Sequence, residues 1–186
     1  MVAINLKKVR SADGKRLALR NNFWPDVADD VLWLRKGRVG FTTVPRTMSL
    51  IGRIMDHLAG KGTPLFGTYL ALWCRVFDEA FVEIRNDKEL AFESGFSGGR
   101  GEATWRTRMR KLQALGFIDI KKGLASDLQY VLIYNPIKVI ATIYDRENLT
   151  RDMAYTALIT RLIEVGADDL DDLNGDVPLT EADEDD

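Results

Sequence analysis

A short amphipathic segment, residues 103–116, restricts the possible folds of this chain more than any other stretch. Its large apolar residues recur at helical spacing and form one stripe, which consists of Trp105, Met109, Leu112 and Leu115. Arg106, Arg110 and Gln113 lie to one side of this stripe, and Gly116 follows as a helix terminator. The segment therefore predicts a helix with one packed face and one cationic face.

The residues on both sides of this helix predict further short elements. Residues 87–96 have the pattern of a short helix, with Asp87 as its cap and Gly95 as its terminator. Residues 117–123 alternate between apolar and polar and predict a strand, and residues 129–134 predict a second strand. A short helix, a turn, a basic helix and a β-hairpin are therefore expected in that order.

This order resembles the winged helix-turn-helix superfamily of DNA-binding domains, in the form found in plasmid- and phage-type regulators and replication proteins. The resemblance covers residues 86–135 and is carried by Leu90, Ala91, Gly95, Trp105, Leu112 and residues 115–118. The connection Ser97–Gly101 departs from it, because it is longer than the three or four residues of a simple helix-turn-helix. The resemblance implies an α+β fold that is mainly α with a small antiparallel β-hairpin, extended by extra N- and C-terminal helices.

Periodicity also predicts helices outside this region. Residues 47–58 and 66–84 carry apolar stripes, the second rich in aromatic residues, and 66–84 is expected to be the longest helix and part of the core. Asn135 and Pro136 predict the start of a helix over residues 137–144. A last helix, residues 150–165, is apolar on more than one face. It forms either a homodimer contact or a buried packing within the monomer.

Charge divides the chain into a basic body and an acidic end. Residues 1–122 hold 22 basic against 13 acidic side chains, whereas residues 123–186 hold 4 against 15, so the net charge of −2 conceals a strong asymmetry. Three regions are expected: a basic arm and irregular segment (1–46), a winged-helix core with C-terminal helices (47–166) and an acidic disordered tail (167–186). The tail serves solubility, competes with DNA for the basic face or contacts a protein partner.

Residues 1–46 are the hardest to interpret. Their basic residues suit a solvated arm and an arm that contacts nucleic acid equally well. Residues 31–34 and 38–44 form either a hairpin or a short helix followed by a strand, and Asp29 and Asp30 favour the second because they suit a helix start. No apolar run approaches the roughly 18 residues of a membrane span, the N-terminus lacks a signal-peptide core, and Cys74 is the single cysteine. These features favour the cytoplasm.

No pattern in the sequence indicates catalysis, a metal site or a cofactor. His57 has no second ligand at metal-binding spacing, and Cys74 is expected to be a buried small hydrophobe. Asp78, Glu79 and Glu83 have ordinary surface patterning. Ser97–Gly101 lacks the Gly-Lys-Ser/Thr ending of a nucleotide loop, so it suits a DNA-backbone contact or a plain turn.

The sequence therefore favours a non-enzymatic protein that binds double-stranded DNA as a transcriptional regulator or a plasmid or phage replication factor. No acidic residue lies between Thr104 and Phe117 to neutralise the helix 103–115, and residues 117–134 form the wing. The expected DNA contacts are Arg100, Arg106, Thr107, Arg110, Lys111, Gln113, Lys121 and Lys122. The alternative is a winged-helix protein-interaction module or inhibitor that does not bind DNA.

Overall fold

The computed structural model describes residues 12–169, and the chain divides into two units, Met1–Phe41 and Thr42–Asp186. The described residues form helices and one small antiparallel sheet, so the predicted α+β class is confirmed. The acidic tail lies almost wholly outside these residues, as does the start of the basic arm. Among residues 12–169, no helix has both the length and the apolar character that a membrane span requires.

Between residues 12 and 41 the first unit contains two helical elements, and no residue from 14 to 41 is buried. They are α1 (Ala12–Phe23) and the short 3₁₀ helix η2 (Asp29–Val31). The predicted short helix at Asp29 is confirmed, but α1 was not predicted, because it lacks a continuous apolar stripe. The predicted strand over residues 38–44 was wrong. Gly37 and Gly40 adopt φ values of 80° and 74° there, which interrupt an extended chain.

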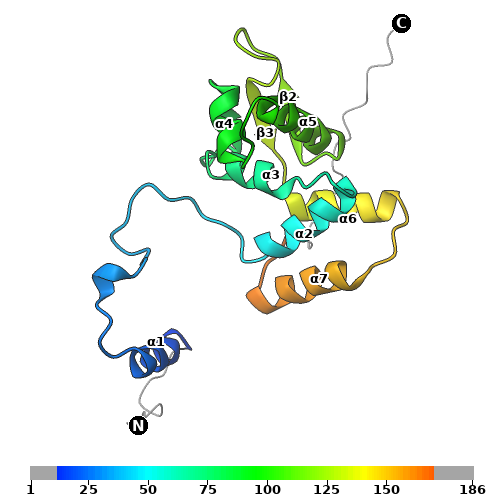
Figure 1. Ribbon diagram of the computed structural model, residues 1–186. Coiled ribbons are helices and arrows are strands. Elements are labelled where there is room, and N and C mark those ends of the chain that lie inside the picture. The colour runs from blue at the N-terminus through cyan, green and yellow to red at the C-terminus, as the bar shows by residue number, and fades with distance from the viewer. Residues whose placement is uncertain (1–11, 170–186) are drawn as a thin grey trace, which may run out of the picture. The chain divides into compact units, whose positions relative to one another are not determined.

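The second unit contains all three strands and the remaining helices (Figure 1). In chain order they are α2 (Met48–Ala59), α3 (Phe66–Trp73), β1 (Phe81–Glu83), α4 (Asp87–Glu93), α5 (Gly101–Ala114), β2 (Ile118–Lys121), β3 (Tyr130–Ile133), α6 (Pro136–Arg146) and α7 (Met153–Val165). Helices α3, α4 and α5 pack together beside the sheet, while α2, α6 and α7 pack at the other end of the unit. The predicted helices after β3 are confirmed.

The sheet has the order β1-β3-β2, with both pairs antiparallel. The expected hairpin is formed by β2 and β3, in which Ile120 lies opposite Val131. The third strand, β1, pairs with the other edge of β3 and places Val82 opposite the same Val131. The hairpin is thus tied to the segment between α3 and α4 as well as to α5.

The predicted long helix 66–84 was wrong, because the helix ends at Trp73 and a turn leads into β1. Ala80, in this turn, has a positive φ of 54°. From Phe81 to Ile84 exposed and buried side chains alternate, with Val82 and Ile84 facing the core. Over such a short run, aromatic and β-branched residues fit the period of a helix as well as that of a strand. Pairing with β3 decides for the strand.

The core of the second unit is one cluster of buried side chains drawn from its helices and its three described strands. Trp105, Tyr69 and Phe117 are its largest fully buried side chains, and the rings of Tyr69 and Phe117 make an edge contact at 6.1 Å. Asp56 of α2 accepts hydrogen bonds from the backbone N–H groups of Leu65 (2.6 Å) and Phe66 (2.8 Å). This carboxylate satisfies donors at the start of α3 that no helical carbonyl can reach.

Candidate nucleic-acid interface

Helix α5 is held in place by the apolar stripe that the sequence predicts. Trp105, Met109 and Leu112 are fully buried. At its start, a Cβ on Gly101 would come within 3.1 Å of the backbone of Phe96, so a side chain there would force this close approach to open by a few tenths of an ångström. The backbone N–H of Phe117 bonds to the carbonyl of Leu112 at the other end. The buried stripe fixes which face of α5 meets solvent.

The exposed face of α5 consists of Ala103, Thr107, Arg110, Lys111 and Ala114. These positions follow the helical repeat and so form one continuous surface. Three of the five side chains are small, two are cationic, and none is acidic. We call this surface the α5 face. Small side chains let a helix approach a partner closely, and the cations supply attraction for an anionic one.

Arg106 lies beside the α5 face in a network of internal carboxylates. It forms ion pairs with Asp87 in the first turn of α4 and with Glu102 one helical turn earlier, at 3.3 Å in the second case. Asp87 is only 9% exposed and also accepts a hydrogen bond from Ser126 at 3.0 Å. The expectation that no acid neutralises this helix overlooked Glu102 and Asp87, which lie outside the stretch 104–117. Arg106 is therefore engaged within the protein.

The other predicted contacts on α5 are more accessible. Arg110 donates to the side-chain oxygen of Gln113 at 3.2 Å, and Gln113 in turn donates to Asp119 of β2 at 3.4 Å. Lys111 is exposed and has no ion pair with any other residue between 12 and 169. Thr107 is exposed and donates its hydroxyl to the carbonyl of Ala103 at 3.1 Å. Gln113 links α5 to the sheet, whereas Arg110 and Lys111 lie outermost.

Arg100 lies where the connection between α4 and α5 ends. It is the N-cap residue of α5, and its side chain is exposed and makes no cap hydrogen bond. The connection runs from Ser94 to Arg100, and Gly95 and Gly98 adopt positive φ values of 87° and 78° within it. The glycines allow this reversal of the chain. Arg100 thus extends the cationic surface toward the start of α5.

The other two acidic residues of α4, Glu89 and Glu93, are both engaged by one arginine. Arg75 bonds to Glu93 at 2.5 Å and to Glu89 at 2.6 Å. Its hydrogen bond and its charge lower the pKa of the Glu93 carboxyl.

The predicted helix cap Asp87 was wrong by one residue, because the side chain of Asn86 accepts from the N–H groups of Lys88 and Glu89.

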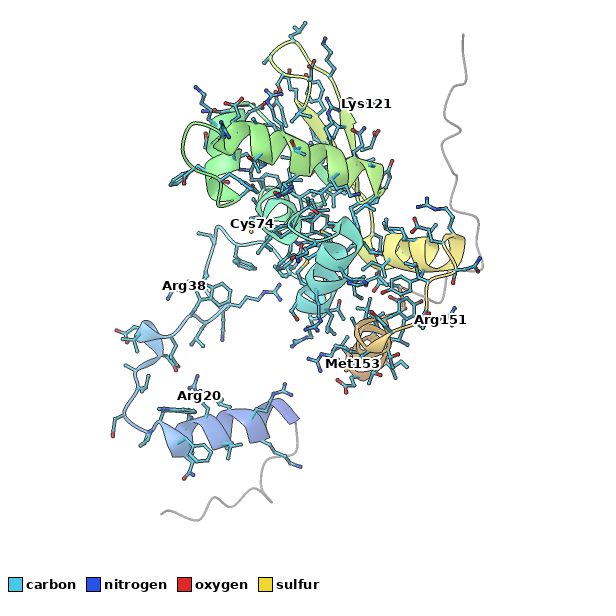
Figure 2. The ribbon with its side chains drawn as sticks, turned by 45° about the vertical axis from the view of Figure 1, so that its right-hand side comes forward. Arg20, Arg38, Cys74, Lys121, Arg151 and Met153 are labelled. Atoms are coloured by element: carbon cyan, nitrogen blue, oxygen red, sulfur yellow. The ribbon has the colours of Figure 1, made fainter. Side chains whose placement is uncertain are left out.

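Lys121 and Lys122 project from the hairpin, and Figure 2 shows Lys121 at the opposite end of the unit from Arg151 and Met153. Each lysine side chain is 79% exposed. Lys121 pairs with Asp119 at 3.4 Å and Lys122 pairs with Asp127 at 3.3 Å. Such exposed ion pairs contribute little to the free energy of unfolding. Each lysine can therefore readily exchange its carboxylate partner for another anion.

The loop that joins β2 to β3 is held by Gln129. Its side-chain oxygen accepts from the backbone N–H of Ala125 at 2.9 Å, and the residue is nearly buried. A Cβ on Gly123 would overlap this amide group, so glycine is required for the close approach. Leu124 at the tip of the loop is fully exposed. The loop therefore presents two lysines and an apolar tip on an ordered base.

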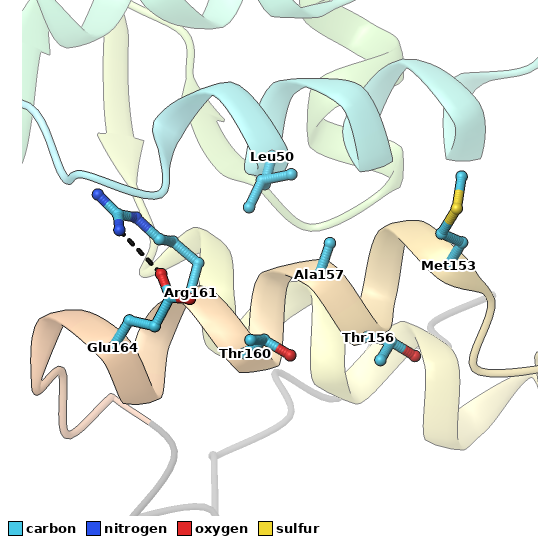
Figure 3. A pocket seen from close by; sticks show the side chains of 7 residues that line it. All are labelled: Leu50, Met153, Thr156, Ala157, Thr160, Arg161 and Glu164. Atoms are coloured by element: carbon cyan, nitrogen blue, oxygen red, sulfur yellow. Dashed lines mark hydrogen bonds and ion pairs between the residues drawn. The ribbon is translucent and has the colours of Figure 1, made fainter.

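A shallow pocket of about 550 Å³ lies between α2 and α7 (Figure 3). It is lined by Leu50, Met153, Thr156, Ala157, Thr160, Arg161 and Glu164. An ion pair between Arg161 and Glu164, at 2.9 Å, borders one end. Tyr155, Leu158 and Leu162 are buried in the protein, but Met153 and Ile163 are exposed. Helix α7 thus packs within the monomer and still presents apolar residues to solvent.

The histidine, cysteine and acidic side chains of the described residues do not gather into a metal centre. Within residues 12–169, no three histidine, cysteine or acidic side chains come close enough together to hold a metal ion. His57 is exposed on α2. The expectation that Cys74 is buried was wrong, because the end of α3 places it at the surface.

No protein-family model matches this chain, and neither the curated proteins nor the solved structures include one with significant similarity to it.

Proposed function

We propose that the second unit binds double-stranded DNA through the α5 face, without catalysis. The observation that carries the proposal is the composition of this face: two outward cations, three small residues and no acid on a helix whose opposite side is buried. A helix of this kind fits the major groove, where small residues permit approach and arginine bonds to guanine. The protein would act in the cytoplasm as a transcriptional regulator or a plasmid or phage replication factor.

The arrangement around α5 supports a winged-helix interpretation. Helix α4 precedes α5 across a turn, the β2–β3 hairpin follows it, and β1 anchors the hairpin by pairing with β3. Lys121 and Lys122 on the hairpin and Arg100 at the start of α5 would contact phosphates on either side of the groove. These contacts would set the register of the protein on the duplex and supply most of the affinity.

The role of Arg106 changes in this proposal. Because Asp87 and Glu102 engage its guanidinium group, base contact falls to Arg110, with Thr107 available for the methyl group of thymine. Arg106 would instead fix the angle between α4 and α5. Gln113 is similarly occupied by Arg110 and Asp119, and it would orient Arg110 toward the groove.

The test compares two matched double variants in full-length protein. Arg110→Ala/Lys111→Ala removes the cations of the α5 face, whereas Arg146→Ala/Arg151→Ala removes one exposed cation at the end of α6 and one in the connection to α7. Affinity for mixed-sequence duplex is measured at several salt concentrations. The first variant is expected to bind at least about tenfold more weakly and to lower the log–log salt slope by about two units. Equal losses in both variants, or none, would reject the proposal.

A protein-interaction role is the second candidate, and the outer face of the sheet favours it. Phe81 of β1 lies opposite Leu132 of β3, and both are about two-fifths exposed. Phe81 also stacks on Tyr130 at 6.1 Å, and Phe77 nearby is largely exposed. If the wild-type protein fails to bind duplex at low salt while a Phe77→Ser/Phe81→Ser variant loses a protein partner, this second function replaces the first.

A further inference from the structure

The loop Leu32–Phe41 of the first unit gathers exposed aromatic rings and cations. Trp33 is 69% exposed and Phe41 is 40% exposed, yet their ring centroids lie 6.2 Å apart in an edge arrangement. The guanidinium carbon of Arg35 lies 5.4 Å from the centre of the Phe41 ring. The two rings are therefore held together at the surface with a cation over one of them.

The backbone of the loop explains how the rings meet. The N–H of Arg38 bonds to the carbonyl of Arg35 at 3.1 Å, and Gly37 within this turn has a φ of 80°. The guanidinium group of Arg38 reaches back to the carbonyl of Leu32 at 3.5 Å. These contacts reverse the chain between Trp33 and Phe41. The ring pair is thus a consequence of local structure and needs no hydrophobic core beneath it.

The charge of this loop is not compensated nearby. No aspartate or glutamate occurs from residue 31 to residue 55, whereas the loop itself contains Arg35, Lys36 and Arg38. Within residues 12–169, none of these three forms an ion pair with a carboxylate. Between residues 14 and 41 no side chain is buried, so the rings and cations are available together.

Exposed rings and unpaired cations in one loop suit a ligand with flat faces and regular negative charge. Single-stranded nucleic acid has both, because its bases are unstacked and its phosphates recur along the strand. A duplex offers the phosphates but encloses its base faces. An acidic peptide offers charge without stacking partners.

We propose that the loop Leu32–Phe41 binds single-stranded nucleic acid. An unpaired base stacks on the Trp33–Phe41 pair, and Lys36 and Arg38 contact the flanking phosphates. Arg35 remains over Phe41 and strengthens the ring's attraction for a polyanion. This site shares no residue with the α5 face, and the proposal does not depend on duplex binding there.

The experiment uses the full chain and two labelled probes, oligothymidylate and oligouridylate of about 16 nucleotides, the upper end of known site sizes. Trp33→Ala/Phe41→Ala is compared with Phe92→Ala/Tyr134→Ala, which removes two exposed aromatic residues of the second unit. The loop variant is expected to bind at least about tenfold more weakly by fluorescence anisotropy. The control is expected to match wild type, and comparing the probes shows whether DNA or RNA is preferred.

Three results would overturn this proposal. The first is no binding of either probe by the wild-type protein at low salt, and the second is equal affinity of the loop variant and the wild type. The third is a loop variant that loses self-association or vesicle binding while it keeps oligonucleotide affinity, which would assign the rings to a second copy or to a lipid surface. Equal unfolding midpoints for all proteins verify that the second unit is intact.

Testing each variant against both ligands distinguishes the two proposed nucleic-acid sites. Arg110→Ala/Lys111→Ala is expected to lose duplex and keep oligothymidylate, whereas the loop variant is expected to do the reverse. Loss of oligothymidylate binding in the α5 variant alone would show that single strands use the α5 face, and this result would overturn the loop site. If the α5 variant, whose loop is unchanged, loses duplex binding alone, that result bears on the α5 face and not on the loop.

Discussion

Arg106 of α5 forms an ion pair with Asp87 in the first turn of α4, and this pair ties the two helices together beside the sheet. The same carboxylate accepts from Ser126 in the β2–β3 loop. One nearly buried acid therefore links three elements that are separate in sequence. Arg106, which the sequence predicts as a DNA contact, has a structural role in the folded chain.

Replacing Asp87 by alanine is expected to destabilise the second unit by about 1–2 kcal/mol, because Arg106 and Ser126 both lose a partner. The upper limit of this destabilisation is modest, because the Arg106 side chain is 39% exposed and water can solvate it. Urea unfolding measures the change. The control Glu83→Ala breaks an exposed pair with Arg85 and should shift the midpoint far less. A larger shift in the control would contradict this account.

Replacing Trp105 by alanine is expected to cost about 3–5 kcal/mol, because the side chain is fully buried where α3, α5 and β2 meet. Trp105→Phe should cost much less. The indole N–H has no hydrogen-bond partner among the described residues, so phenylalanine removes an unsatisfied donor while it keeps most of the ring. Chemical denaturation of both variants checks this order, and equal costs would contradict it.

The contribution of Arg75 to stability is expected to fall at acidic pH. The hydrogen bond from Arg75 lowers the pKa of the Glu93 carboxyl below its ordinary value of 4.5. Stability from this depressed pKa is fully present above the unfolded value and is lost as the pH falls through the folded one. Wild type and Arg75→Gln should therefore differ in unfolding midpoint above the ordinary glutamate pKa of 4.5 and converge as the pH falls through the depressed pKa of Glu93. A constant difference would contradict this cause.

We propose that α7 also contributes to a homodimer, through the apolar residues that remain exposed on it. Met153 and Ile163 are both exposed, although Tyr155, Leu158 and Leu162 are buried in the monomer. Met153→Ser/Ile163→Ser is expected to shift a concentration-dependent mass toward that of the monomer without changing the helix content. Sedimentation velocity measures the mass. A wild-type chain that stays monomeric at high concentration would reject the dimer.

Local periodicity was sufficient to predict the elements that carry strong apolar patterns. The stripe of α5, the β2–β3 hairpin and the start of α6 at Pro136 are all formed as expected. In each case the pattern is long enough, or the cap specific enough, to exclude the alternatives. The same reasoning missed α1, which has no continuous apolar stripe.

The sequence alone determined that α5 has one buried and one cationic side, because helical spacing fixes which residues share a face. Tertiary structure decided which of its cations are available. Asp87 and Glu102 engage Arg106, whereas Arg110 and Lys111 remain outermost. It also decided that Phe81–Glu83 is a strand, by pairing with β3. Ion pairs and strand pairing join residues distant in sequence, and no local pattern specifies those partners.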